Sequence, residues 1–208
     1  MSRSRTPEPK RLLDTVSSRA AGRILDAALA LITKQGDAHV TMAQIARAAR
    51  VSRQAVYLHF ADRAELMVAL ARHLDAELGL PAEIQRMADA TSGAEQVEAM
   101  VSLQARTNPS LWAVARAVDA VRRTDPAADR AWQDRLDARL AGCRHIVARL
   151  ESEGNLQAGL DASSAADILW TITSLRTWED LVLGRGWSPQ KYQRHVTRFL
   201  LATLTRGA

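Results

Sequence analysis

The chain has 208 residues, of which 47% are apolar and 25% charged, with a formal net charge of +5 and a pI of about 10.1. This length suffices for one large domain, or for a small domain joined to a larger one. No apolar run approaches the roughly eighteen residues that span a bilayer. The polar, basic start MSRSRTPEPKRLLD lacks a secretory signal, and the single Cys143 cannot form an internal disulfide, so we expect a cytoplasmic protein without a membrane segment.

The excess positive charge lies in the first third of the chain. Residues 1–63 carry 11 Lys/Arg and 5 Asp/Glu, whereas residues 64–208 carry 17 and 18. A basic segment of this kind favours a polyanionic partner such as nucleic acid. A solvated basic tail would give the same asymmetry, so composition leaves both interpretations open.

Helix signals recur along the whole chain, and no stretch has the alternation of a strand. The sequence therefore predicts an all-α fold of about nine helices. Residues 1–18 are expected to form a flexible basic arm, whose Arg3 or Arg5 would enter a minor groove or act only as nonspecific charge. A first helix is predicted over 19–35, ending at Gly36.

Two short helices follow, joined by a turn at residues 49–51. Thr41-Met-Ala-Gln has the spacing of a capping box, and Ser52 is placed to cap the second helix. Val56 and Phe60 are four residues apart, so they share the face that we expect to be buried. Two short helices and a three-residue turn predict a helix-turn-helix.

The second of these helices has a surface of hydrogen-bond donors, with no carboxylate from Val51 to Ala61. In its first turn, Arg53 can be bidentate to guanine and Gln54 to adenine. Tyr57 can donate to a phosphate, which fixes the position of the protein on the duplex. The residues predicted to contact double-stranded DNA are Thr41, Met42, Arg50, Ser52, Arg53, Gln54, Ala55, Tyr57, Leu58, His59 and Arg63.

The segment RILDAALALITKQGDAHVTMAQIARAARVSRQAVYLHFADRAELMVAL (23–70) resembles the N-terminal domain of the tetracycline-repressor (TetR) family of transcriptional regulators. GRGWSPQKYQRHV (184–196) is similar to a helix boundary near the C-terminus of many members. Many members have Gly where Ala49-Arg50 stands and Lys where Arg63 stands.

The resemblance implies a repressor that binds a palindromic operator as a homodimer. It also implies that a small molecule, bound in the C-terminal domain, tilts the fourth helix and releases DNA. We therefore expect a helix-turn-helix domain over 19–65 and a helical regulatory and dimerisation domain over 66–208. The sequence does not identify the ligand.

A dimer is also expected because one helix-turn-helix reads few base pairs, and two half-sites about 34–36 Å apart supply the rest. The last helices, predicted over 163–183 and 189–205, are apolar on more than one side. The expected interface is Ile168, Ile172, Leu175, Trp178, Leu183, Tyr192, Val196, Phe199, Leu200 and Thr203. The same residues could instead form the core of one chain, and both roles are compatible.

The helices over about 94–153 are expected to enclose the small-molecule site. Trp and Met give adaptable apolar walls, and a few polar groups can orient a ligand. The candidate lining residues are Met100, Leu103, Gln104, Trp112, Arg116, Trp132, Trp170, Thr173, Ser174 and Thr177. Plain core packing would also account for each of them.

The sequence also bears on three other functions. An enzyme is not expected, since the histidines are scattered and no HExxH, paired CxxC or GxSxG is present; no metal or cofactor is expected either. A ligand-independent architectural or division-linked DNA binder would use the helical body for protein contacts and have a filled core. A basic helical protein that docks on an acidic protein would show no preferred DNA sequence.

Overall fold

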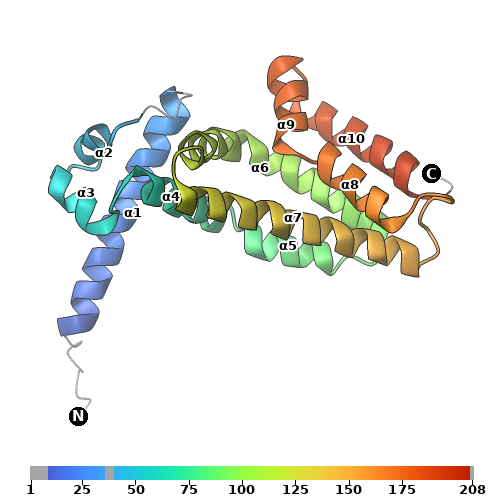
Figure 1. Cartoon of the computed structure of the whole chain (residues 1–208), viewed down its shortest axis with the longest axis horizontal. Coiled ribbons are helices and arrows are strands. Elements are labelled where there is room, and N and C mark those ends of the chain that lie inside the picture. The colour runs from blue at the N-terminus through green and yellow to red at the C-terminus, as the bar shows by residue number, and fades with distance from the viewer. Residues whose placement is uncertain (1–8, 36–39, 207–208) are drawn as a thin grey trace, which may run out of the picture. The chain divides into compact units, whose positions relative to one another are not determined.

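A computed structural model describes residues 9–35 and 40–206, and within the first helix it describes the side chains from Arg19 to Lys34. The secondary structure of these residues is helical, apart from one isolated bridge between Leu156 and Thr205 (Figure 1). The helices are α1 (Pro9–Gln35), α2 (Met42–Ala48), α3 (Arg53–His59), α4 (Arg63–Glu77), α5 (Leu80–Ala88), α6 (Gly93–Arg122), α7 (Pro126–Ser152), α8 (Ala162–Ile172), α9 (Leu175–Trp178), the π-helix η1 (Glu179–Gly184) and α10 (Pro189–Leu204). The all-α prediction is confirmed.

Helix α1 begins at Pro9, ten residues before the expected start at Arg19. Arg3 and Arg5 of the expected arm, and Gly36 after α1, lie outside the described residues. The proposed roles of these three residues therefore stay predictions.

The chain divides into two compact units, one made of Met1–His73 and Ala113–Asp129 and the other of Leu74–Trp112 and Arg130–Ala208. The boundaries between the units fall within α4, α6 and α7. The expected domain boundary after residue 65 also falls within α4.

In the first unit, α1, α2 and α3 pack on one another. Val56 and Phe60 are buried, as their spacing predicts, and so is Ile45 of α2. His73 Nε2 of α4 lies 2.8 Å from Asp26 Oδ1 of α1, which ties these two helices together at the surface. Each of the two short helices has only seven residues, so its own backbone hydrogen bonds do little to stabilise it. Both helices are held in place by the apolar core that they share.

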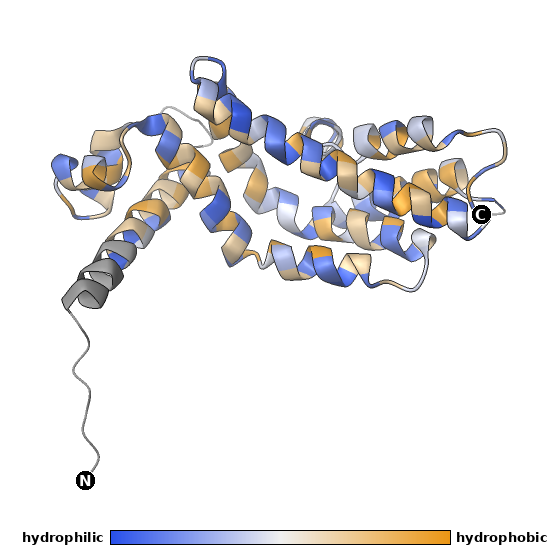
Figure 2. Cartoon of the chain, turned by 60° about the horizontal axis from the view of Figure 1, so that its bottom comes forward, coloured by the Kyte–Doolittle hydropathy of each residue, from blue (hydrophilic) through white to orange (hydrophobic). Residues whose placement is uncertain are grey.

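In the second unit, one large apolar cluster joins α6, α7, α8 and α10. Figure 2 shows hydrophobic and hydrophilic residues interleaved along the helices of the chain. Leu150, Leu169, Tyr192 and Leu200 are fully or almost fully buried in it. None of the described helices combines the length and hydropathy that crossing a bilayer requires.

Asn108-Pro109 has the sequence pattern of a helix start, a capping residue followed by a proline, but no helix begins there in the structure. Helix α6 runs without interruption from Gly93 to Arg122 and contains Pro109. Val101 before the proline and Val118 after it are both buried along this helix. Burial on both sides of Pro109 outweighs the local breaking signal, since tertiary packing overrides a proline's loss of one helical hydrogen bond.

The structure also divides the helix that was predicted over 163–183. Helix α8 ends at Ile172, and Ser174 then caps the short α9 by accepting a hydrogen bond from the Thr177 N–H at 3.1 Å. The π-helix η1 follows directly. The apolar periodicity continues across the break, so it could not reveal that Ser174 acts as a new N-cap.

Candidate nucleic-acid interface and interior polar cluster

The first helix of the predicted motif begins with the capping box that the sequence indicates. Thr41 Oγ1 accepts a hydrogen bond from the Gln44 N–H at 3.3 Å, and Gln44 Oε1 accepts one from the Thr41 N–H at 2.7 Å. Met42 is buried, so what it can offer to DNA is its backbone N–H at the start of α2. The capping box thereby fixes this end of α2, at which Thr41 is exposed.

The turn between α2 and α3 contains Arg50 in a left-handed conformation, with φ of 56°. The Val51 N–H donates to the Ala46 carbonyl at 3.0 Å, which closes the end of α2. Glycine is the residue that adopts this conformation at no steric cost. Arg50 is exposed, and its charge lies at the turn that separates the two helices.

Helix α3 presents the predicted donor face. Ser52 Oγ accepts from the Ala55 N–H at 3.1 Å and fixes the first turn. Arg53 and Gln54 are exposed in that turn, and Leu58 is 85% exposed on the outer side. His59 is half-buried beside the Phe60 ring, with ring centroids 6.3 Å apart.

Arg53 and Tyr57 form a pair one turn apart on this face. Arg53 Nη2 donates to Tyr57 Oη at 3.4 Å, and its guanidinium carbon lies 5.6 Å from the centre of the ring. The same hydrogen bond raises the pKa of Arg53 above its ordinary value. Tyr57 is 41% exposed, so a cation and an amphipathic ring lie side by side where an anion can approach.

Arg63 has a different position from the one that the sequence suggests. It is half-buried, and its Nε donates to the Val40 carbonyl at 3.2 Å. This bond holds the backbone directly before Thr41. In the structure Arg63 therefore supports the start of α2, while a phosphate contact from it stays a prediction.

The residues that build this motif match the family model described as bacterial regulatory proteins, tetR family, over residues 24–70. Residues 24–70 are a TetR-family N-terminal domain. The match covers α2, α3 and the parts of α1 and α4 that pack around them, and thus the whole donor face.

Solved structures resemble the chain over most of its length. A transcriptional regulator from Saccharomonospora viridis in complex with choline has a TM-score of 0.78 at 20% identity, covering 91% of this chain and 99% of that one. A TetR-family regulator from Mesorhizobium loti has a TM-score of 0.64 at 23% identity, covering 91% and 98%. The regulator FadR from Bacillus subtilis, in complex with stearoyl-CoA, has a TM-score of 0.66 at 18% identity, covering 87% and 97%. The chain thus has the fold of TetR-family regulators, although its sequence matches no curated protein.

Outside the TetR-family domain, the residues predicted to line a ligand site differ in burial. Met100 and Thr173 are buried and Arg116 is exposed. The half-buried members are Leu103, Gln104, Trp112, Trp132, Trp170, Ser174 and Thr177. Arg116 belongs to the other compact unit, although it is on the same helix α6 as Trp112.

Gln104 and Thr173 meet at the break after α8. Gln104 Nε2 donates to the Thr173 carbonyl at 2.7 Å, and its Oε1 accepts from Tyr192 Oη at 3.3 Å. Thr177 Oγ1 donates to the Thr171 carbonyl at 3.0 Å. Side chains from α6 and α9 thus satisfy carbonyls that a continuous helix would have bonded internally.

Arg139 of α7 completes this interior polar cluster and was not predicted. Its Nη1 donates to the carbonyls of Trp170 at 2.7 Å and Thr173 at 3.2 Å. Its guanidinium carbon lies 4.5 Å from the centre of the Trp170 ring. The sequence does contain one sign of this position, because Arg139 lies on the apolar stripe of α7. Four, seven and eleven residues further along this stripe are the buried residues Cys143, Ile146 and Leu150.

Burial shifts the neighbours of Arg139 toward their neutral forms. The pKa of the Cys143 thiol rises to about 11 and that of the Tyr192 phenol to about 12, in both cases because desolvation disfavours the anion. Desolvation also lowers the pKa of Arg139. Cys143 is therefore a buried core residue whose thiol stays protonated at neutral pH.

The residues predicted for the dimer interface separate into three groups by burial. Trp178, Tyr192, Val196 and Leu200 are buried within the chain, so they serve its own core. Leu183 and Phe199 are each 50% exposed. The remaining members, which are half-buried, are Ile168, Ile172, Leu175 and Thr203.

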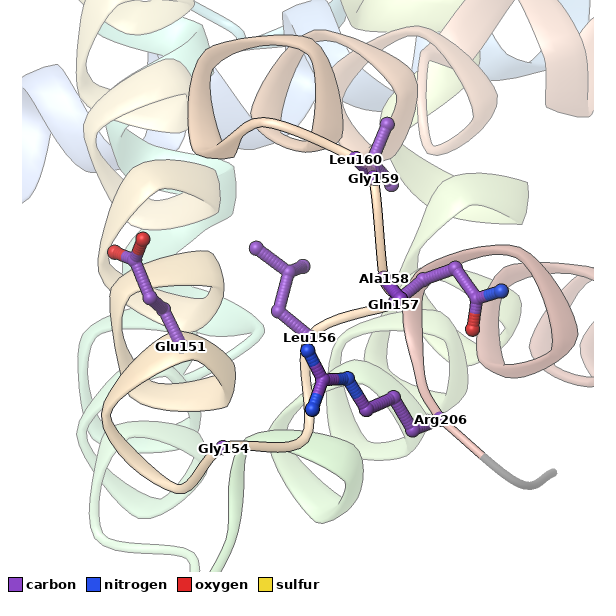
Figure 3. Close-up of a pocket in the computed structure, with 8 residues that line it drawn as sticks. All are labelled: Glu151, Gly154, Leu156, Gln157, Ala158, Gly159, Leu160 and Arg206. Carbon is purple, nitrogen blue, oxygen red and sulfur yellow. The ribbon is translucent and has the colours of Figure 1, made fainter.

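A shallow pocket lies at the opposite end of α8 from the interior cluster. It is lined by residues of the α7–α8 connection and by Arg206 (Figure 3). The Arg206 N–H donates to the Asn155 carbonyl at 2.9 Å, and the Gln157 N–H donates to the Leu204 carbonyl at 2.8 Å. These bonds fasten the end of α10 to the connection. The pocket was not predicted from the sequence, and its lining is mostly loop backbone and exposed side chains.

Proposed function

We propose that this protein is a cytoplasmic TetR-type repressor that binds a palindromic operator as a homodimer and is released by a small molecule. The observation that carries the proposal is the capped helix α3. Its exposed first turn presents Arg53 and Gln54 from a rigid start set by Ser52. Arginine and glutamine at the N-terminal end of a recognition helix are the groups that read guanine and adenine in the major groove.

The phosphate contacts proposed beside them come from several elements. The N-terminus of α2 at Thr41 and Met42 offers backbone donors, and Arg50 and Tyr57 add exposed side-chain donors. Their role is to position α3 on the duplex. Leu58, exposed on the same helix, is proposed to meet a thymine methyl group.

The proposed dimer uses the apolar surface that one chain leaves uncovered on α8, η1 and α10. Helix α10 contacts both α8 and η1, so the three elements adjoin one another. Leu183 of η1 and Phe199 of α10 are large apolar side chains that these elements expose. Large exposed apolar side chains on adjoining elements favour an interface.

The proposed release needs a molecule that binds the DNA-free arrangement better than the DNA-bound one. The interior polar cluster around Gln104 and Thr173 is the proposed site, because several helices contribute to it. The complexes of the Saccharomonospora viridis regulator with choline and of FadR with stearoyl-CoA support a ligand within this fold.

The proposal is tested by selection from random duplex DNA. Purified protein is mixed with a random library at about physiological salt, and retained fragments are sequenced. The expected result is a two-fold palindrome whose half-sites lie about one helical turn apart. Retention without an enriched sequence would favour the architectural function, and no retention would contradict DNA binding altogether.

A further inference from the structure

Two carboxylates and an imidazole meet between α1 and α4. His73 Nε2 of α4 lies 2.8 Å from Asp26 Oδ1 of α1. Glu77 follows His73 by four residues on the continuous helix α4, so both side chains lie on one face of that helix. One ligand atom from each of the three residues lies within 4.8 Å of the other two. Among the side chains that the structure describes, this is the one such group of metal-ligating residues.

The spacing of these atoms suits a metal ion. Zinc binds imidazole nitrogen and carboxylate oxygen at about 2.0–2.2 Å, so the ligand atoms of a tetrahedral site lie about 3.4 Å apart. Small rotations of the three side chains would bring their ligand atoms to such distances around one point. The Asp26 side chain is 60% exposed, whereas that of His73 is 23% exposed. Water can therefore reach the group and complete the coordination of an ion bound there.

The chemistry of the donor set indicates which ion would bind. Two carboxylates beside a neutral imidazole carry two negative charges, which one divalent cation balances. An imidazole ligand favours zinc and its transition-metal neighbours over magnesium and calcium, which prefer oxygen ligands alone. Two ligands at positions i and i+4 of one helix, as at His73 and Glu77, are also how helices present metal ligands in other proteins.

We propose that Asp26, His73 and Glu77 bind a divalent transition-metal ion such as Zn²⁺, which fastens α4 to α1. Helix α1 also packs on α2 and α3, so the ion would hold α4 against the helix that supports both of them. The sequence gives no sign of this group, because 47 residues separate Asp26 from His73. An ordinary surface ion pair would also account for the 2.8 Å contact. The two explanations differ in what happens when zinc is added.

The test uses Zn²⁺ alone as the probe on the full-length protein without DNA. Protein freed of metal with a chelator is titrated with Zn²⁺ in competition with a chromophoric zinc chelator. Wild type is compared with Asp26→Asn, His73→Gln and Glu77→Gln, and circular dichroism checks that each variant keeps its helices. His145→Gln is the matched control, because His145 is exposed on α7 and belongs to no such group.

Wild type and His145→Gln are expected to bind one Zn²⁺ per chain with a micromolar or lower Kd. Each substitution within the group should weaken this binding about tenfold or more, because one of three ligands is lost. Millimolar Mg²⁺ should not displace the zinc. Amide hydrogen exchange measures the link between the helices, and zinc should slow exchange in both α1 and α4 of wild type but not in α1 of Asp26→Asn.

The metal site is overturned if wild type binds no zinc, or if the three substitutions weaken zinc binding no more than His145→Gln does. An ion pair alone would give this result. The link between the helices is overturned if Asp26→Asn binds zinc as tightly as wild type, or if zinc leaves exchange in α1 unchanged. DNA is absent from these measurements, so their result does not depend on whether α3 reads an operator.

Discussion

Ser52 Oγ accepts a hydrogen bond from the Ala55 N–H at 3.1 Å, three residues further along α3. This bond sets where the recognition helix begins and which side chains occupy its first turn. Helix α3 has only seven residues, so its own hydrogen bonds do little to hold it.

Two substitutions distinguish the role of Ser52 as a helix cap from its proposed position against DNA. Ser52→Ala should lower the free energy of unfolding by about 1 kcal/mol, because the Ala55 N–H loses its partner. Ser52→Asp should keep stability within about 0.5 kcal/mol, since aspartate caps equally well, yet weaken DNA binding about tenfold by placing a carboxylate against phosphate. Urea unfolding and DNA titration measure the two effects. Full DNA affinity in Ser52→Asp would argue against a DNA-facing helix start.

Arg50 is predicted to be a strained position. An L-residue at φ of 56° costs about 1–2 kcal/mol, whereas glycine costs about 0.5–1 kcal/mol of chain entropy. Arg50→Gly should therefore raise the free energy of unfolding by about 0.5–1 kcal/mol. Arg47→Gly, inside α2, should lower it by about 1 kcal/mol. A lower urea midpoint for Arg50→Gly than for wild type would contradict the strain.

Phe199 tests the proposed dimer. Phe199→Glu should give a monomer in light scattering at micromolar concentration, because a charge would be buried in the interface. Operator affinity should fall about a hundredfold when two half-sites are no longer bound together. Ile84→Glu on α5 is the control, since Ile84 is similarly exposed at 51%. A dimer that persists in Phe199→Glu would place the interface elsewhere.

Cys143 gives the chain a predicted loss of stability at alkaline pH. Its folded pKa of about 11 lies above the ordinary value of 9.0, so the unfolded chain loses its proton first. The contribution of Cys143 to the free energy of unfolding is therefore fully present below pH 9. It decreases by about 2 kcal/mol as the pH rises toward 11. Cys143→Ala should lack this part of the decline. Urea unfolding between pH 8 and 10.5 measures it, and parallel curves for the two proteins would refute the assignment.

Most of the DNA-binding motif could be predicted from sequence because it depends on local signals. Capping residues act within three positions of themselves, so Thr41 and Ser52 indicated the starts of their helices correctly. The burial of Val56 and Phe60 followed from their spacing on one helix. The left-handed turn at Arg50 was signalled only by the family's glycine there.

Gln104, Thr173 and Thr177 of the interior polar cluster were among the predicted lining residues, but Arg139 was not, because its place in the cluster depends on which helices meet. Nothing near Arg139 in the sequence shows that it reaches the end of α8, thirty-one residues away at Trp170. The local pattern at Pro109 indicates a helix start, but packing along α6 outweighs it and the helix continues through the proline. The four interface candidates found in the core show the same limit, since an apolar stripe does not reveal whether its partner is the same chain or another.

The most direct test of the central proposal is base specificity at α3. Affinities of wild type, Arg53→Ala, Gln54→Ala and Arg144→Ala are measured for the selected operator and for operators with each base pair changed in turn. We predict that Arg53→Ala and Gln54→Ala each lose about 1–3 kcal/mol and become indifferent to one base pair of each half-site, while Arg144→Ala matches wild type. Unchanged affinity and specificity in both variants would contradict the assignment of α3 as the helix that reads DNA.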